Sequence, residues 1–268
     1  MTFTNDNEGS TGIFSDLNFA EILFLLCLDF EAGKSGIFSV TCKSNLEVTG
    51  IESIDHSLLS ALFRKRIFTD ENYSGSPADY KKNLKCVLLK LPLKGNEIEV
   101  SSIYSSLLGS INSYTIEKKD IQKIESIITE IQLRKLYQLV DIVSTASSIP
   151  IEKSNPLQAL LLYLAKNYAP QNMLATFEFI ARKSSVDIHK NNRPFYRAKH
   201  IFTKILGEFI HSMERRELKL DKAKDIPTDI IISPFESRFC EFFLDDQFNF
   251  NRLSQRQAIA LWLNADAD

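Results

Sequence analysis

Apolar side chains recur at helical spacing through the middle of this 268-residue chain. The stripe consists of Ile121, Ile124, Ile128, Ile131, Leu136, Leu139 and Val143. Its spacing drifts from a strict heptad, because Lys135 and Gln138 stand where a coiled coil needs apolar residues. The pattern therefore predicts a helix that packs within a globular bundle.

Short runs with strand character precede this stripe. Residues 36–42 and 84–91 are rich in β-branched and other apolar side chains, which favour strands. Residues 45–51 and 97–103 follow at hairpin distance and are expected to pair with them. The N-terminal part of the chain is therefore expected to contain a small sheet of about four strands.

The remaining segments read as helices. Their expected ranges are 18–30, 53–68, 156–168, 171–183, 194–218, 234–245 and 254–263. We therefore predict an α+β fold class, with a small N-terminal α+β domain followed by a mainly α-helical domain. The predicted order is a disordered tail at 1–12, the α+β domain at 13–112 and the helical domain at 113–268, with a linker at 144–155.

Composition indicates a soluble globular protein. The chain is 44% hydrophobic and carries 32 Lys+Arg against 34 Asp+Glu, which excludes global disorder. No apolar run has the length of a membrane span, and the polar, acidic N-terminus is unlike a signal peptide. The four cysteines include no C-x-x-C pair, and the apolar neighbours of Cys27 and Cys86 predict burial. These features predict a cytoplasmic protein with reduced thiols and no membrane partner.

Motifs for catalysis or metal binding are weak. Gly33-Lys34-Ser35 matches the end of a phosphate-binding loop, but Leu28 stands where that loop needs its first glycine. The neighbours Asp55, His56 and Ser57 point in different directions on a helix and cannot form a triad. The four histidines lack zinc-ligand spacing. We therefore predict no catalytic residue, no metal, no cofactor and no enzymatic activity.

Residues 12–41 combine a leucine-rich helical pattern with a strand that opens at a glycine. The positions that carry this pattern are Leu17, Ile22, Leu23, Leu26, Gly36, Ile37 and Val40. The segment resembles the opening of a bacterial signalling-associated domain found in PatA-like and gliding-motility regulators. The resemblance implies a bacterial protein–protein interaction module, although residues 45–51 depart from the strand of that family's second half.

Charge is unevenly distributed along the chain. Residues 181–224 carry 12 basic and 5 acidic side chains, while the segments on both sides are net acidic. We call residues 181–204 the basic segment; Phe195 and Tyr196 are interleaved with its cations. Its candidate binding residues are Arg182, Lys183, Lys190, Arg193, Arg197, Lys199 and Lys204. The segment fits a solvated helix face, a surface for an acidic protein, or a surface for a phosphate backbone.

These features lead to one functional expectation and one rival. We expect a non-catalytic cytoplasmic adaptor or structural subunit of a larger multi-protein assembly, which binds protein partners through charge-segregated surfaces. The alternative is a nucleic-acid-binding accessory protein that uses the basic segment. No feature of the sequence identifies a small-molecule substrate.

Overall fold

The structure is a computed structural model that describes residues 14–32, 37–40, 48–69, 87–90, 100–215, 224–227, 230, 232–244 and 248–265. The chain divides into two compact units. The N-terminal unit comprises Met1–Ile124 and Ser233–Phe239, and the helical unit comprises Glu125–Ile232 and Cys240–Asp268. The domain limits and the linker expected from the sequence remain predictions.

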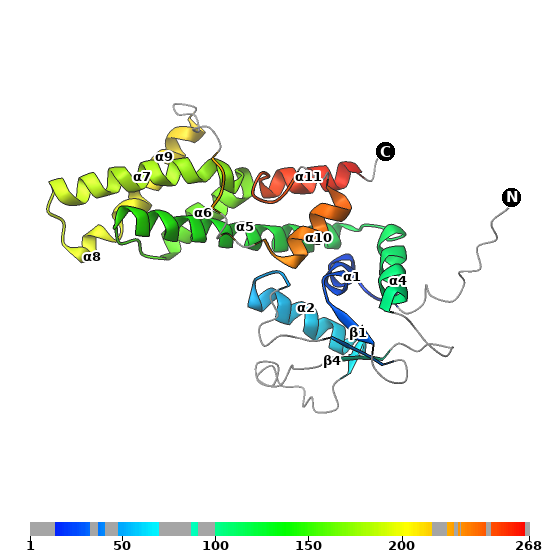
Figure 1. Ribbon diagram of the computed structural model, residues 1–268. Helices are drawn as coiled ribbons and strands as arrows, with labels where there is room; N and C mark the ends of the chain where they lie inside the picture. The colour runs from blue at the N-terminus through cyan, green and yellow to red at the C-terminus, as the bar shows by residue number, and fades with distance from the viewer. Residues whose placement is uncertain are drawn as a thin grey trace. The chain divides into compact units, whose positions relative to one another are not determined.

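Helix α1 (Phe19–Leu26) lies at the centre of the N-terminal unit, and all eight of its residues are buried. The helix begins with a capping box, in which the Asn18 side chain accepts from the Glu21 N–H and the Glu21 carboxylate accepts from the Asn18 N–H. Helices α2 (Glu52–Arg64) and α4 (Val100–Asn112) pack against it (Figure 1). The sequence of this helix is apolar except for Glu21, and its burial explains that composition.

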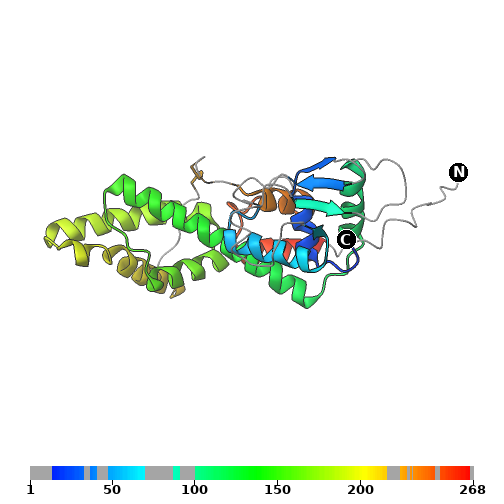
Figure 2. The same cartoon turned by 90° about the horizontal axis from the view of Figure 1, so that it is seen from below.

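Four short antiparallel strands form one sheet in the order β1-β2-β4-β3. The strands are β1 (Phe30–Ala32), β2 (Ile37–Val40), β3 (Phe68–Thr69) and β4 (Val87–Lys90). Helix α4 lies beside the sheet (Figure 2), and the Tyr104 ring contacts the Phe30 ring edge-on with the centroids 5.5 Å apart. The small sheet is therefore covered by a helix of its own unit.

The predicted α+β fold class is wrong. Helices make up more than two thirds of the described chain, whereas no strand exceeds four residues, so this is a helical protein. The strand expected over 97–103 is wrong for residues 100–103, which belong to α4, because Ile103, Leu107 and Ile111 repeat at helical spacing and are buried on one face; residues 97–99 lie outside the described residues. The described residues 48–51 are not in a strand either; β2 pairs instead with β1, directly after the first helix.

The long apolar stripe forms helix α5 (Lys118–Ser147), and this prediction is confirmed. Helices α6 (Asn155–Asn167), α7 (Pro170–Lys190) and α9 (Ile201–Glu214) build a common core with its C-terminal part. Its largest members include Phe177 and Phe202, whose rings meet edge-on with the centroids 5.9 Å apart. The bundle interpretation of the stripe is therefore correct.

The two polar residues that interrupt the apolar stripe, Lys135 and Gln138, differ in their burial. Lys135 is fully buried, and its ammonium donates to Asn251 Oδ1 over 2.7 Å. One turn earlier, the Gln132 amide donates to the carbonyls of Phe250 and Leu253. These bonds attach the segment before helix α11 (Gln255–Ala265) to α5, whereas Gln138 is half-buried. Polar residues at core positions of α5 thus fix the segment before α11 through hydrogen bonds.

Helix α10 (Pro234–Phe243) precedes α11 in the chain. Among the residues that the structure describes, no helix combines the length and the apolar character that a membrane span needs.

Candidate functional site

The basic segment lies at one end of the helical unit, where α7 is followed by the short helix α8 (Phe195–Ala198) and then by α9 (Figure 1). Helix α7 extends to Lys190, seven residues beyond the predicted end. It ends where Asn192 takes a left-handed conformation with φ of 45°, and the Arg193 N–H donates back to the Ile188 carbonyl. Asparagine tolerates this conformation well, so the sequence Asn191-Asn192 explains the reversal of the chain.

Arg193 is held by an ion pair within the segment. Its Nε lies 2.5 Å from Asp187 Oδ2 and its Nη2 lies 3.3 Å from Oδ1, so the guanidinium grips both carboxylate oxygens. The Asn191 side chain donates to the same carboxylate. The hydrogen bond from Arg193 lowers the pKa of Asp187 below its ordinary value. Arg193 therefore closes the turn after α7.

Lys199 is held in the same way on the other side of α8. Its ammonium lies 2.6 Å from Glu152 Oε1, and its carbonyl accepts from the Glu152 N–H. His200 Nδ1 lies 3.1 Å from Glu152 Oε2. The single helix expected over 194–218 is therefore wrong, because α8 ends at Ala198 and α9 begins at Ile201. Glu152 contacts the two residues between these helices, and the hydrogen bond from Lys199 lowers the pKa of Glu152.

Exposed side chains lie on α8 between these two anchors, where only Ala198 is buried, and at Lys190, just before the first anchor. Phe195 is 73% exposed and Tyr196 is 61% exposed, which makes them the most exposed large apolar side chains of the described chain. Arg197 is exposed and its guanidinium carbon lies 5.6 Å from the centroid of the Tyr196 ring. Lys190 is exposed and makes no ion pair with any described residue. We call residues 190–197 the exposed tip.

The other candidate cations lie on the flanking helices. Lys204, on α9, is 3.8 Å from Glu208 one turn later. On α7, the Arg182 Nε donates to the Glu178 carbonyl, and the Lys183 ammonium lies 4.5 Å from the centroid of the Phe179 ring. Arg197 thus lies beside the exposed Tyr196 ring and Lys190 is exposed at the end of α7, while Arg193 and Lys199 serve as internal anchors.

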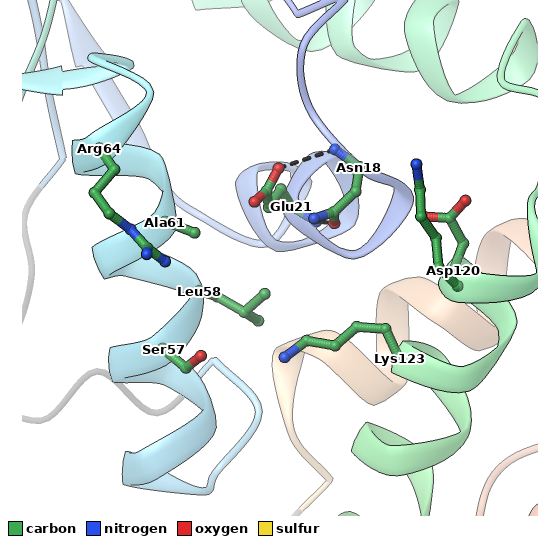
Figure 3. Close-up of a pocket in the computed structure, with 9 residues that line it drawn as sticks. Asn18, Glu21, Ser57, Leu58, Ala61, Arg64, Asp120 and Lys123 are labelled. Carbon is green, nitrogen blue, oxygen red and sulfur yellow. Dashed lines mark hydrogen bonds between the residues drawn. The ribbon is translucent and has the colours of Figure 1, made fainter.

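A separate cavity of about 350 Å³ lies in the N-terminal unit between α1, α2 and the first turns of α5 (Figure 3). It is lined by Asn18, Glu21, Ser57, Leu58, Ala61, Arg64, Lys119, Asp120 and Lys123. Glu21 is paired with Lys65 over 2.6 Å, and the Asp120 carboxylate accepts from the Tyr114 hydroxyl and the Glu117 N–H. Both carboxylates of the cavity therefore have partners.

Cys27 is half-buried, and its thiol is shielded from water. Its Sγ donates to the Leu23 carbonyl, and burial raises the pKa of the thiol. The nearby Asp55 carboxylate accepts from the backbone and hydroxyl of Thr49 over 2.8 and 2.6 Å. At neutral pH Cys27 is therefore a neutral thiol and not an activated nucleophile.

In the part of the chain that the structure describes, no three His, Cys, Asp or Glu side chains lie close enough together to hold a metal ion. Gly33-Lys34-Ser35 and Cys86 lie outside the described residues.

Sequence reasoning missed the acids that position the basic segment. Asp187 is the single acidic residue of the basic segment. Its ion pair with Arg193 spans the end of α7, and this helix was expected to end earlier. Glu152 lies 47 residues before Lys199, and no local pattern indicates that contact.

Comparison with family models, with curated proteins and with solved structures gives no match to this chain. The resemblance of residues 12–41 to the signalling-associated domain therefore gains no support from these comparisons.

Proposed function

We propose that this protein is a non-catalytic cytoplasmic adaptor or structural subunit of a larger assembly, and that the exposed tip docks on an acidic protein partner. The observation that carries the proposal is the pair of neighbouring aromatic side chains, Phe195 and Tyr196, which are exposed to solvent next to Arg197. Tyrosine and arginine are enriched among the residues that dominate binding energy at protein interfaces.

The two rings offer a large gain on burial. An aromatic side chain buries about 150–250 Å², and each Å² of apolar surface removed from water contributes about 25 cal/mol. Most of this area is still exposed on Phe195 and Tyr196. A partner with an apolar depression would therefore gain several kcal/mol from these two side chains, before the cost of association.

The ion pairs on both sides of α8 keep the exposed tip ordered, so that its aromatic side chains stay accessible to a partner. Asp187 fixes Arg193 before the helix, and Glu152 fixes Lys199 after it. A surface that is already ordered loses less conformational entropy when it binds. The paired cations thus hold the tip in place, whereas Lys190 and Arg197 can meet acidic groups at the rim of a partner's depression.

A nucleic-acid-binding accessory protein is the second candidate. Exposed rings beside cations can stack on the bases of a single strand. The internal pairing of Arg193 and Lys199 supports the protein partner over this candidate, because phosphate contacts require several free cations along a track.

Site-specific photocross-linking in the cells that produce the protein tests the proposal. A photoreactive phenylalanine analogue replaces Phe195 in one sample and Leu263, an apolar residue partly exposed on α11, in the control. We expect one defined protein adduct from position 195, insensitive to nuclease, and none from position 263. Adducts that consist of nucleic acid support the second candidate. Identical adducts from both positions contradict a docking role of the tip.

A further inference from the structure

The cavity of the N-terminal unit contains cations without partners. Arg64 reaches it from the last turn of α2 and Lys123 from α5, and neither side chain forms an ion pair with a described residue. Figure 3 shows both charged ends directed into the space between the two helices. The exposed Ser57 hydroxyl also faces this space and has no hydrogen bond among the described residues.

The other charged side chains at the cavity have local partners. Lys65 lies 2.6 Å from Glu21, and Glu117 lies 2.8 Å from Lys119. Asp120 is occupied by hydrogen bonds at the start of α5. Arg64 and Lys123 therefore remain, on opposite walls of the cavity, as the two lining cations without an ion pair to a described residue, and the Asp120 carboxylate leaves the lining with a net positive charge of one.

We infer that this cavity binds a compact anionic group, a carboxylate or a phosphate, between Arg64 and Lys123 with the Ser57 hydroxyl as an additional donor. A guanidinium donates two parallel hydrogen bonds to either anion, and an ammonium adds a point charge. A volume of about 350 Å³ suits a small ligand. This site is independent of the exposed tip and of the proposed docking function.

Isothermal titration of the full chain with inorganic phosphate and, separately, with succinate tests the inference at constant ionic strength. We expect saturable binding of at least one of these anions with a stoichiometry of one. Arg64→Gln and Lys123→Gln should each weaken it by roughly tenfold, because each removes a charge-assisted hydrogen bond. The relative affinities for phosphate and succinate distinguish the two kinds of group.

Lys118→Gln is the matched control, because Lys118 is exposed on the same helix and does not line the cavity. Its affinity should equal that of the wild type, and an equal loss in this variant overturns the site in favour of unspecific charge attraction. Arg64 could instead complement the C-terminal dipole of α2. In that case Arg64→Gln lowers the melting temperature without changing the affinity, which also overturns the inference, as does the absence of binding by both anions.

Discussion

The two arginines near α8 differ in their contacts although they are only four positions apart. Arg193 grips both oxygens of Asp187, whereas Arg197 is exposed and contacts the neighbouring Tyr196 ring. The sequence does not distinguish the two arginines, and their helical spacing predicted that they belong to one binding surface. The difference depends on a carboxylate placed by the last turn of α7, which spacing does not reveal.

Alanine substitution should separate the two roles. Arg193→Ala should lower the melting temperature, because it removes the bidentate partner of Asp187 and loosens the turn. Arg197→Ala should change the free energy of unfolding by less than about 0.5 kcal/mol, as is usual for an exposed side chain. Thermal unfolding followed by circular dichroism measures both, and equal melting temperatures for the two variants contradict the anchor role of Arg193.

The titration of Asp187 gives a second test at this scale. Its pKa is lowered chiefly by the hydrogen bond from Arg193, from the ordinary value of 3.8. The contribution of this pair to stability is therefore complete above the ordinary pKa and is lost as the pH falls through the lowered pKa. Carbon-detected NMR titration should give a midpoint below 3.8 in the wild type and a higher midpoint in Arg193→Gln. Identical midpoints would exclude the pair in solution.

Cys27 should react slowly with thiol reagents. Burial raises the pKa of its thiol, and the thiolate is the reactive form. Labelling of the native protein with iodoacetamide, read by peptide mass spectrometry, should modify Cys27 much more slowly than after denaturation. Equal rates in the two states would show that α1 is not packed as described.

At the scale of elements, helices were easier to predict than strands. The stripe of α5 is long, and all its apolar positions from Ile124 onward are buried, so periodicity alone identified it. Strands β2 and β4 lie within the predicted ranges 36–42 and 84–91, but β1 and β3 were not predicted, because strands of two or three residues are too short for a reliable alternating pattern. Pairing between β2 and β4 joins segments 47 or more residues apart, which no local signal specifies.

The packing of α7 on α9 can be tested by comparing alanine substitutions of a buried and an exposed phenylalanine. Phe202→Ala should lower the free energy of unfolding by about 3–5 kcal/mol, because Phe202 is fully buried against Phe177 and its loss leaves a cavity. Phe195→Ala, at a position that is 73% exposed, should change it by less than about 0.5 kcal/mol. Denaturant unfolding measures both changes. Similar losses for the two variants would show that Phe195 belongs to the core.

At the scale of the whole molecule, charge segregation identified the candidate cations but not the contacts that each of them makes. The candidate cations cluster around the junction of α7, α8 and α9, as a local segment must. Their division into anchors and exposed groups depends on Glu152, which lies in the connection between α5 and α6. The cavity of the N-terminal unit was not predicted, because its lining comes from three helices distant in sequence.

The central claim is that the exposed tip joins the protein to an assembly. Gradient sedimentation of nuclease-treated lysate from cells that naturally produce the protein measures this most directly. The tip variant combines Phe195→Ser, Tyr196→Ser and Arg197→Glu. The control combines Lys166→Glu, Arg256→Glu and Leu263→Ser, all exposed positions on α6 and α11 of the same unit.

Both variants should unfold like the wild type in vitro, because the replaced side chains are exposed. We predict that the wild type and the control sediment with a partner as a large particle, while the tip variant sediments as the free chain. Sedimentation of the tip variant together with the wild type in the large particle would contradict the proposed function.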